Sequence, residues 1–83
     1  MKVSDLIAQL KEFPQDAEVV QAKDGEGNSF SPLADVSLGR YEAETTWGGQ
    51  WGLLELTDEL KKQGYGEEDV PNGPPTICLW PTN

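Results

Sequence analysis

Apolar residues near the start of the chain recur every three or four positions and then stop at a proline. The recurring residues are Val3, Leu6, Ile7, Leu10 and Phe13. This spacing places them on one face of an α-helix, which Pro14 cannot continue. The next segment, 17–23 (AEVVQAK), has the length and valine content of a β-strand, and the glycine-rich DGEGN ends it. This change of periodicity predicts a fold that combines helix and sheet.

Two further strands and a hairpin are predicted in the middle of the chain. Residues 29–44 and 50–56 have the composition of antiparallel strands. Gly48 and Gly49 between them predict a two-residue turn, in which glycine supplies the positive backbone angles that the turn needs. In such a hairpin, Trp47 and Trp51 would flank the turn and meet across it.

A short second helix is predicted from its end signals. Thr57 is typical of a helix N-cap, acids occupy the first turn and lysines the last, and Gly64 is placed to end the helix. Residues 67–71 predict one more turn, and residues 76–81 a final strand. We therefore expect a single α+β domain over residues 1–83, in which the N-terminal amphipathic helix packs on a mainly antiparallel sheet of three or four strands.

The chain is strongly acidic, with 15 acidic and 6 basic residues and a formal net charge of −9. A negative surface repels nucleic-acid phosphates and anionic lipids, which argues against direct binding to nucleic acid or membrane. It favours partners with a basic surface, although acidity also serves simply to keep a small protein soluble. Lys2 is followed by Ser4 and Asp5 where a secretory signal needs an apolar run, so we expect a cytoplasmic protein.

The residues usually needed for catalysis are missing. The chain has no histidine, the most common general base at neutral pH. Its one cysteine, Cys78, has no second thiol or histidine with which to bind zinc. Paired acids could act as general acid and base only in a deep cleft, which an 83-residue domain rarely provides. The candidate sets are Glu42 with Glu44, and Glu67, Glu68 and Asp69. We therefore expect a non-enzymatic protein without cofactor or metal.

Residues 24–35 superficially follow the spacing of a calcium-binding loop. Oxygen ligands would come from Asp24, Glu26, Asn28 and Asp35. The segment departs from the EF-hand pattern because Ser29 replaces the required glycine and Pro32 interrupts the loop. A polar turn is the favoured interpretation, and calcium or small-ligand binding remains an alternative.

The two indoles near Gly48 and Gly49 have two interpretations. In a chain of this size most large apolar side chains are needed for the core, which favours a structural role for Trp47 and Trp51. If either indole is exposed, the acids around it would make it resemble an interface anchor with a polar rim.

Several segments resemble short, mostly uncharacterised proteins encoded by bacteriophages and prophages. The resemblance rests on residues 3–20 (VSDLIAQLKEFPQDAEVV), 24–36 (DGEGNSFSPLADV), 56–71 (LTDELKKQGYGEEDVP) and 79–83 (LWPTN). The junction PQDAEV and the segment GYGEEDV are its most specific parts. It implies a small single domain of phage type, and it assigns no catalytic or binding residue.

Charge and resemblance together lead to a functional hypothesis. Many small acidic phage proteins bind and disable a host protein, and a negative surface can occupy a groove built for phosphates. We expect a protein that binds a basic site on a host protein, such as a defence nuclease or CRISPR effector. Two alternatives to host-protein binding stay open. One is the binding of calcium or a small ligand, and the other is a structural role as a homo-oligomer. The expected contact residues are Glu42, Glu44, Trp47, Trp51, Glu67, Glu68 and Asp69.

Overall fold

A computed structural model describes residues 1–82, whose contacts group them into two units. Unit 1 comprises residues 1–35 and 80–82, and unit 2 comprises residues 36–79. The prediction of one domain over residues 1–83 stays a prediction.

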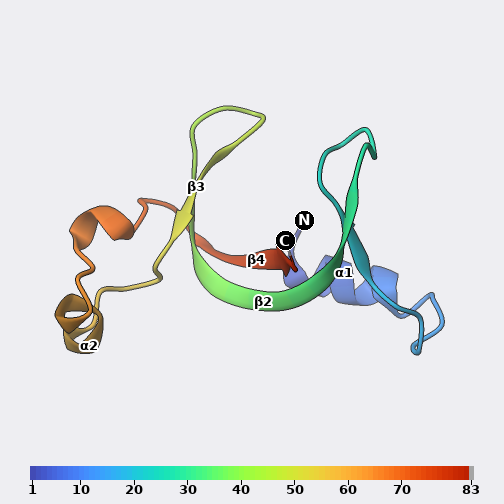
Figure 1. Ribbon diagram of the computed structural model, residues 1–83, viewed down its shortest axis with the longest axis horizontal. Coiled ribbons are helices and arrows are strands. Elements are labelled where there is room, and N and C mark those ends of the chain that lie inside the picture. Colours follow the sequence, from blue (N-terminus) through green and yellow to red (C-terminus); the bar gives the residue numbers. More distant parts are fainter. Residues whose placement is uncertain (83) are drawn as a thin grey trace. The chain divides into compact units, whose positions relative to one another are not determined.

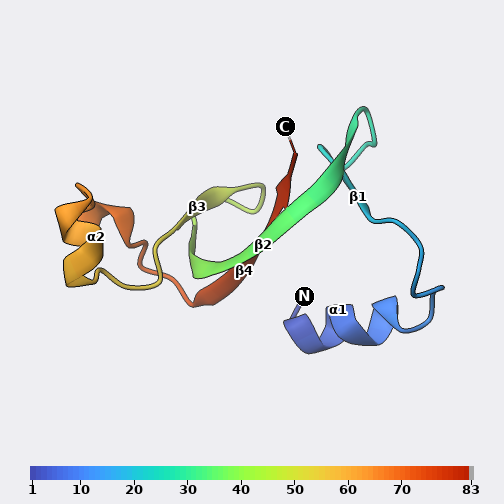
Figure 2. The same cartoon turned by 60° about the horizontal axis from the view of Figure 1, so that its bottom comes forward.

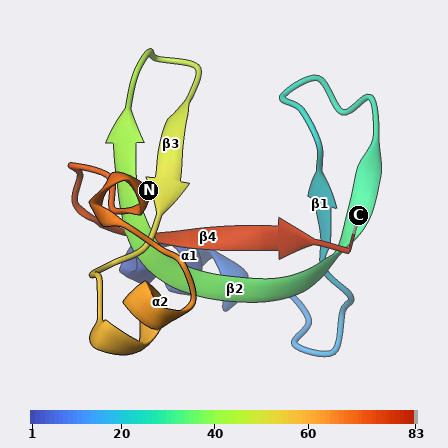
Figure 3. The same ribbon diagram turned by 60° about the vertical axis from the view of Figure 1, so that its left-hand side comes forward.

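The elements follow one another as helix, three strands, helix, 3-10 turn and strand (Figure 1). Their bounds are α1 Val3–Leu10, β1 Val20–Ala22, β2 Phe30–Ala43, β3 Gly49–Gly52, α2 Asp58–Lys62, η1 Glu67–Asp69 and β4 Pro75–Pro81. The long strand β2 pairs antiparallel with β1 through its first residues and with β3 through its last. β4 also pairs with β2, and Figure 3 shows the two strands running side by side. An N-terminal helix, a mostly antiparallel open sheet of four strands and a short second helix confirm the predicted α+β class.

In unit 1, helix α1 begins after Lys2, whose backbone N–H donates to the Asp5 carboxylate at 3.0 Å. Asp5 therefore satisfies a free N–H at the start of the helix, the role that a capping side chain performs.

Also in unit 1, Ser31 of β2 is buried, with only 1% of its surface exposed, and it forms hydrogen bonds with Thr82. The two hydroxyl oxygens are 3.1 Å apart, and the Thr82 N–H donates to Ser31 Oγ at 3.2 Å. This polar contact fixes β2 against the end of the chain.

In unit 2, the signals predicted for the second helix are confirmed. The Leu60 N–H donates to Thr57 Oγ1 at 3.2 Å, so Thr57 is the N-cap of α2. Beyond the helix, Gly64 has a φ of 102°, a conformation that glycine adopts without steric penalty.

Arg40 joins three segments of unit 2. Its Nε donates to the carbonyl oxygen of Leu54 at 2.7 Å, and its Nη1 donates to that of Gly73 at 3.0 Å. The side chain is half-buried, so these charge-assisted bonds are partly shielded from water. Arg40 therefore links β2 to the segments that follow β3 and precede β4.

Gly39 allows Trp51 to lie close against strand β2. An alanine Cβ at position 39 would lie 2.5 Å from the indole ring and would also meet the Gly52 carbonyl oxygen. Any side chain at position 39 would therefore displace the indole or the neighbouring strand.

Replacing Gly39 with alanine is expected to lower the free energy of unfolding by about 2 kcal/mol, the usual cost of forcing extra atoms into a filled site. Chemical denaturation measures this change. Gly48→Ala is the matched control, because a Cβ there has no atom within 4 Å and Gly48 does not have a positive φ. Equal destabilisation by both substitutions would contradict the packing described for Trp51.

Candidate functional site

The loop between β2 and β3 is held by its own hydrogen bonds. The N–H groups of Glu44 and Thr45 donate to the Gly48 carbonyl oxygen at 3.1 and 3.0 Å. The Thr45 hydroxyl oxygen accepts from the N–H groups of Trp47 and Gly48 at 3.0 and 3.1 Å. Figure 1 shows this loop projecting at the end of the β2–β3 hairpin. The chain therefore presents residues 44–48 in a defined conformation.

The predicted two-residue turn at Gly48 and Gly49 is wrong. Gly49 is the first residue of β3, and neither glycine has a positive φ. The Thr45 hydroxyl supplies the reason, because a side chain that binds nearby backbone N–H groups stabilises a wider loop. Gly49 is instead needed for close approach, since a Cβ there would meet the Glu42 carbonyl oxygen.

Trp47 lies in this loop and is 93% exposed. Tryptophan is normally highly buried, because its ring provides a large apolar surface. The Trp47 backbone N–H is bound by Thr45, so the exposed indole stands on an ordered part of the chain. An exposed indole on an ordered loop is the arrangement expected of an interface anchor.

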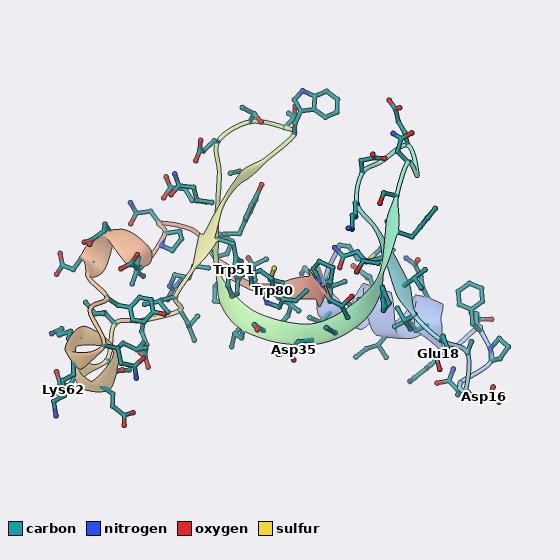
Figure 4. All side chains as sticks on the ribbon, viewed as in Figure 1. Asp16, Glu18, Asp35, Trp51, Lys62 and Trp80 are labelled. Atoms are coloured by element: carbon teal, nitrogen blue, oxygen red, sulfur yellow. The ribbon has the colours of Figure 1, made fainter. Side chains whose placement is uncertain are left out.

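Trp51 has a structural role in the sheet. It is half-buried, lies opposite Tyr41 in the strand register and donates its indole N–H to the Thr76 carbonyl oxygen at 3.1 Å. Figure 4 shows its side chain at the base of the hairpin. The predicted pairing of Trp47 with Trp51 is therefore wrong, because the register places Tyr41 opposite Trp51 and leaves Trp47 in the loop.

The acidic residues predicted for partner binding fall into two groups. Glu44 belongs to the same loop as Trp47 and is exposed, whereas Glu42 is half-buried and accepts a hydrogen bond from the Asn72 N–H at 2.7 Å. The second group forms η1, which lies beside α2 and away from the hairpin loop (Figure 2). In that group Glu67 and Glu68 are exposed, and Asp69 accepts from the Gly66 N–H at 2.9 Å.

The sequence on both sides of Trp47 carries charge of one sign. Residues 41–60 contain five acidic residues and no lysine or arginine. Glu44 lies three residues from Trp47, and both side chains are exposed. The candidate site therefore consists of an exposed indole within a negatively charged segment, and the exposed acids of η1 form a separate group in the same unit.

The loop that suggested calcium binding uses its carboxylate internally. Asp24 Oδ1 accepts from the N–H groups of Glu26 and Asn28 at 2.9 and 3.2 Å, and Oδ2 accepts from the Asn28 side-chain amide at 3.0 Å. The bond from the Asn28 side chain is the main reason why the pKa of Asp24 lies below 3.8, the ordinary value for an aspartate. The backbone N–H groups lower it further. Within residues 1–82, no three acidic or cysteine side chains gather in a way that could hold a metal ion.

The lowered pKa of Asp24 predicts how this loop responds to acid. The unfolded carboxyl binds a proton more readily than the folded one, so its contribution to stability is present above pH 3.8 and is lost as the pH falls through the lower folded pKa. Nuclear magnetic resonance should show the amide signals of Glu26 and Asn28 titrating with a midpoint below pH 3.8. A midpoint at or above that value would contradict the loop geometry, and Asp24→Asn should remove the transition.

No protein family, curated protein or solved structure matches this chain. Neither helix within residues 1–82 has the length and apolar character needed to cross a bilayer.

Proposed function

We propose that this chain is a non-enzymatic protein-binding module that inserts Trp47 into an apolar pocket on a protein with a basic surface. The observation that carries the proposal is the 93% exposure of Trp47 on a loop fixed by Thr45. Tryptophan is among the residues that most often dominate binding energy at protein interfaces.

The order of the loop supports this role. A flexible loop loses conformational freedom when it binds, and that loss weakens affinity. Four backbone N–H groups of residues 44–48 already donate hydrogen bonds within the loop. The loop therefore has little further ordering to undergo when Trp47 enters a pocket.

The negative charge supports a basic partner. Glu44 beside Trp47, together with the net charge of −9, attracts a positive surface, with a range of about 8 Å at physiological salt. This attraction raises the association rate, and contact with the indole then slows dissociation.

The resemblance to phage-encoded proteins supports a partner in the cytoplasm of a bacterial host. Proteins that handle nucleic acid have grooves lined with lysine and arginine, and carboxylates can take the place of phosphates there. We propose such a protein as the target, for example a defence nuclease or a CRISPR effector, and inhibition by occupation of its nucleic-acid groove.

Capture from a bacterial lysate with the tagged chain tests this proposal. We expect a partner that is retained at low salt, released at high salt and displaced by a DNA or RNA duplex. Thr46→Ala serves as the matched control for Trp47→Ala, because it changes the adjacent exposed residue of the same loop. A partner whose retention is unaffected by salt, by nucleic acid and by Trp47→Ala would overturn the proposal.

A further inference from the structure

Asn72 and Gly73 form a bend between η1 and β4, and the pair Asn-Gly occurs once in the sequence. The Asn72 side chain is exposed to water. Within residues 1–82, neither its amide group nor the Gly73 backbone N–H forms a hydrogen bond. The two groups that react when an asparagine loses ammonia are therefore both available.

The fold requires a glycine after Asn72. A Cβ at position 73 would overlap the Tyr41 carbonyl oxygen, so any other residue would push β2 away from this bend. A following glycine also makes an asparagine reactive, because no side chain shields the Gly73 nitrogen. The packing of unit 2 therefore retains a reactive pair of residues at this bend.

From this pair we infer that Asn72 is a modification site, at which the folded chain converts asparagine without an enzyme into aspartate and isoaspartate. The Gly73 nitrogen attacks Asn72 Cγ and forms an N–Cγ bond. The Cγ–Nδ2 bond breaks, and the amide nitrogen takes the Gly73 proton and leaves as ammonia. Water then opens the five-membered ring. Opening at Cγ gives aspartate, and opening at the backbone carbonyl carbon gives isoaspartate, whose main chain runs through Cβ and Cγ.

The bend is anchored on both sides, so the modification changes the structure around it. The Asn72 N–H donates to Glu42 Oε1 at 2.7 Å, and the Gly73 carbonyl oxygen accepts from Arg40 Nη1 at 3.0 Å. Isoaspartate adds an atom to the main chain between these hydrogen bonds, so they cannot both keep their geometry. Either product also adds a negative charge close to the Glu42 carboxylate, which increases repulsion within unit 2.

Asn28 is an internal control for this reaction. It is exposed like Asn72, but its side-chain amide donates to Asp24 Oδ2 at 3.0 Å, and Ser29 follows it in place of a glycine. The hydrogen bond restrains the amide, and the serine side chain hinders attack by the backbone nitrogen. Asn72 should therefore convert at least about 10-fold faster than Asn28.

Peptide mapping by mass spectrometry tests the modification on the folded chain, kept in mildly alkaline buffer well below its melting temperature. Position 72 should gain about one mass unit as ammonia is released. Asn72→Gln is the matched variant, because it keeps the amide but must close a less reactive six-membered ring, so position 72 should then stay unmodified. The purified isoaspartate form should melt about 4 °C or more below the fresh chain.

A denatured sample of the same chain provides the reference. Conversion confined to the denatured sample would overturn the inference, because it would show that the fold prevents ring closure at Asn72. Equal rates at Asn28 and Asn72, or an unchanged melting temperature of the isoaspartate form, would also contradict it. These measurements use the chain alone, so their outcome does not depend on the proposed partner of Trp47.

Discussion

Replacing Trp47 with alanine is expected to weaken partner binding by at least about 30-fold, the loss typical of a central interface residue. The expected effect is large because Trp47 is 93% exposed in the free chain and can transfer almost its whole ring into a pocket. The melting temperature should stay within about 2 °C of wild type, because an exposed side chain adds little to the stability of the free chain. Isothermal titration with the captured partner measures the affinity, and calorimetry measures the melting temperature.

Two substitutions isolate the contribution of the indole. Trp47→Phe keeps an aromatic ring of smaller area and should recover part of the affinity. Thr46→Ala changes a neighbouring exposed residue and should leave both the affinity and the melting temperature unchanged. If Trp47→Ala binds as tightly as wild type, the indole is not the anchor.

Replacing Arg40 with alanine is expected to reduce the free energy of unfolding by about 3 kcal/mol, because two charge-assisted hydrogen bonds are lost and two carbonyl groups lose a donor. Those carbonyls belong to Leu54 and Gly73, whose oxygens lie 2.7 and 3.0 Å from the guanidinium nitrogens. Small domains are stable by only about 5–15 kcal/mol, so this change removes a large share of the total. Chemical denaturation followed by circular dichroism measures it.

Conservative and charge-matched variants define the cause of that loss. Arg40→Lys retains the positive charge but lacks the fork that reaches both carbonyls, so most of the destabilisation should remain. Lys61→Ala removes one positive charge from an exposed pair with Asp58, whose atoms are 3.9 Å apart, and should cost less than about 0.5 kcal/mol. Equal effects of Arg40→Ala and Lys61→Ala would indicate a dependence on net charge alone.

Signals within a few residues of one another predicted the elements of the fold. The apolar spacing of residues 3–13 predicted the helix observed as α1, and Thr57 and Gly64 predicted both ends of α2. These predictions succeeded because capping and glycine conformation depend on local backbone geometry. Helix α1 ends at Leu10, however, so Phe13 lies beyond the helix that the apolar pattern suggested.

Features that depend on distant residues could not be predicted. Arg40 binds carbonyl groups 14 and 33 residues away, and no local pattern indicates such partners. The exposure of Trp47 and the partial burial of Trp51 follow from the strand register, which pairs Tyr41 with Trp51. The incorrect two-residue turn implied a different register, in which Trp47 and Trp51 faced each other. The threonine at position 45, two residues before Trp47, was the available signal for the wider loop, because its hydroxyl competes for backbone N–H groups.

Fluorine resonance of the chain labelled with 5-fluorotryptophan shows directly whether a partner covers the Trp47 indole. The three tryptophans give three signals. The signal that disappears in Trp47→Phe belongs to Trp47, and the one that disappears in Trp51→Phe belongs to Trp51. In the free chain the Trp47 signal should shift between H₂O and D₂O as a fully hydrated ring does, and the Trp51 signal should shift less. Addition of the partner should abolish the solvent dependence of Trp47 alone. A Trp47 signal that keeps its full solvent dependence in the complex would contradict the proposal that this indole is the binding anchor.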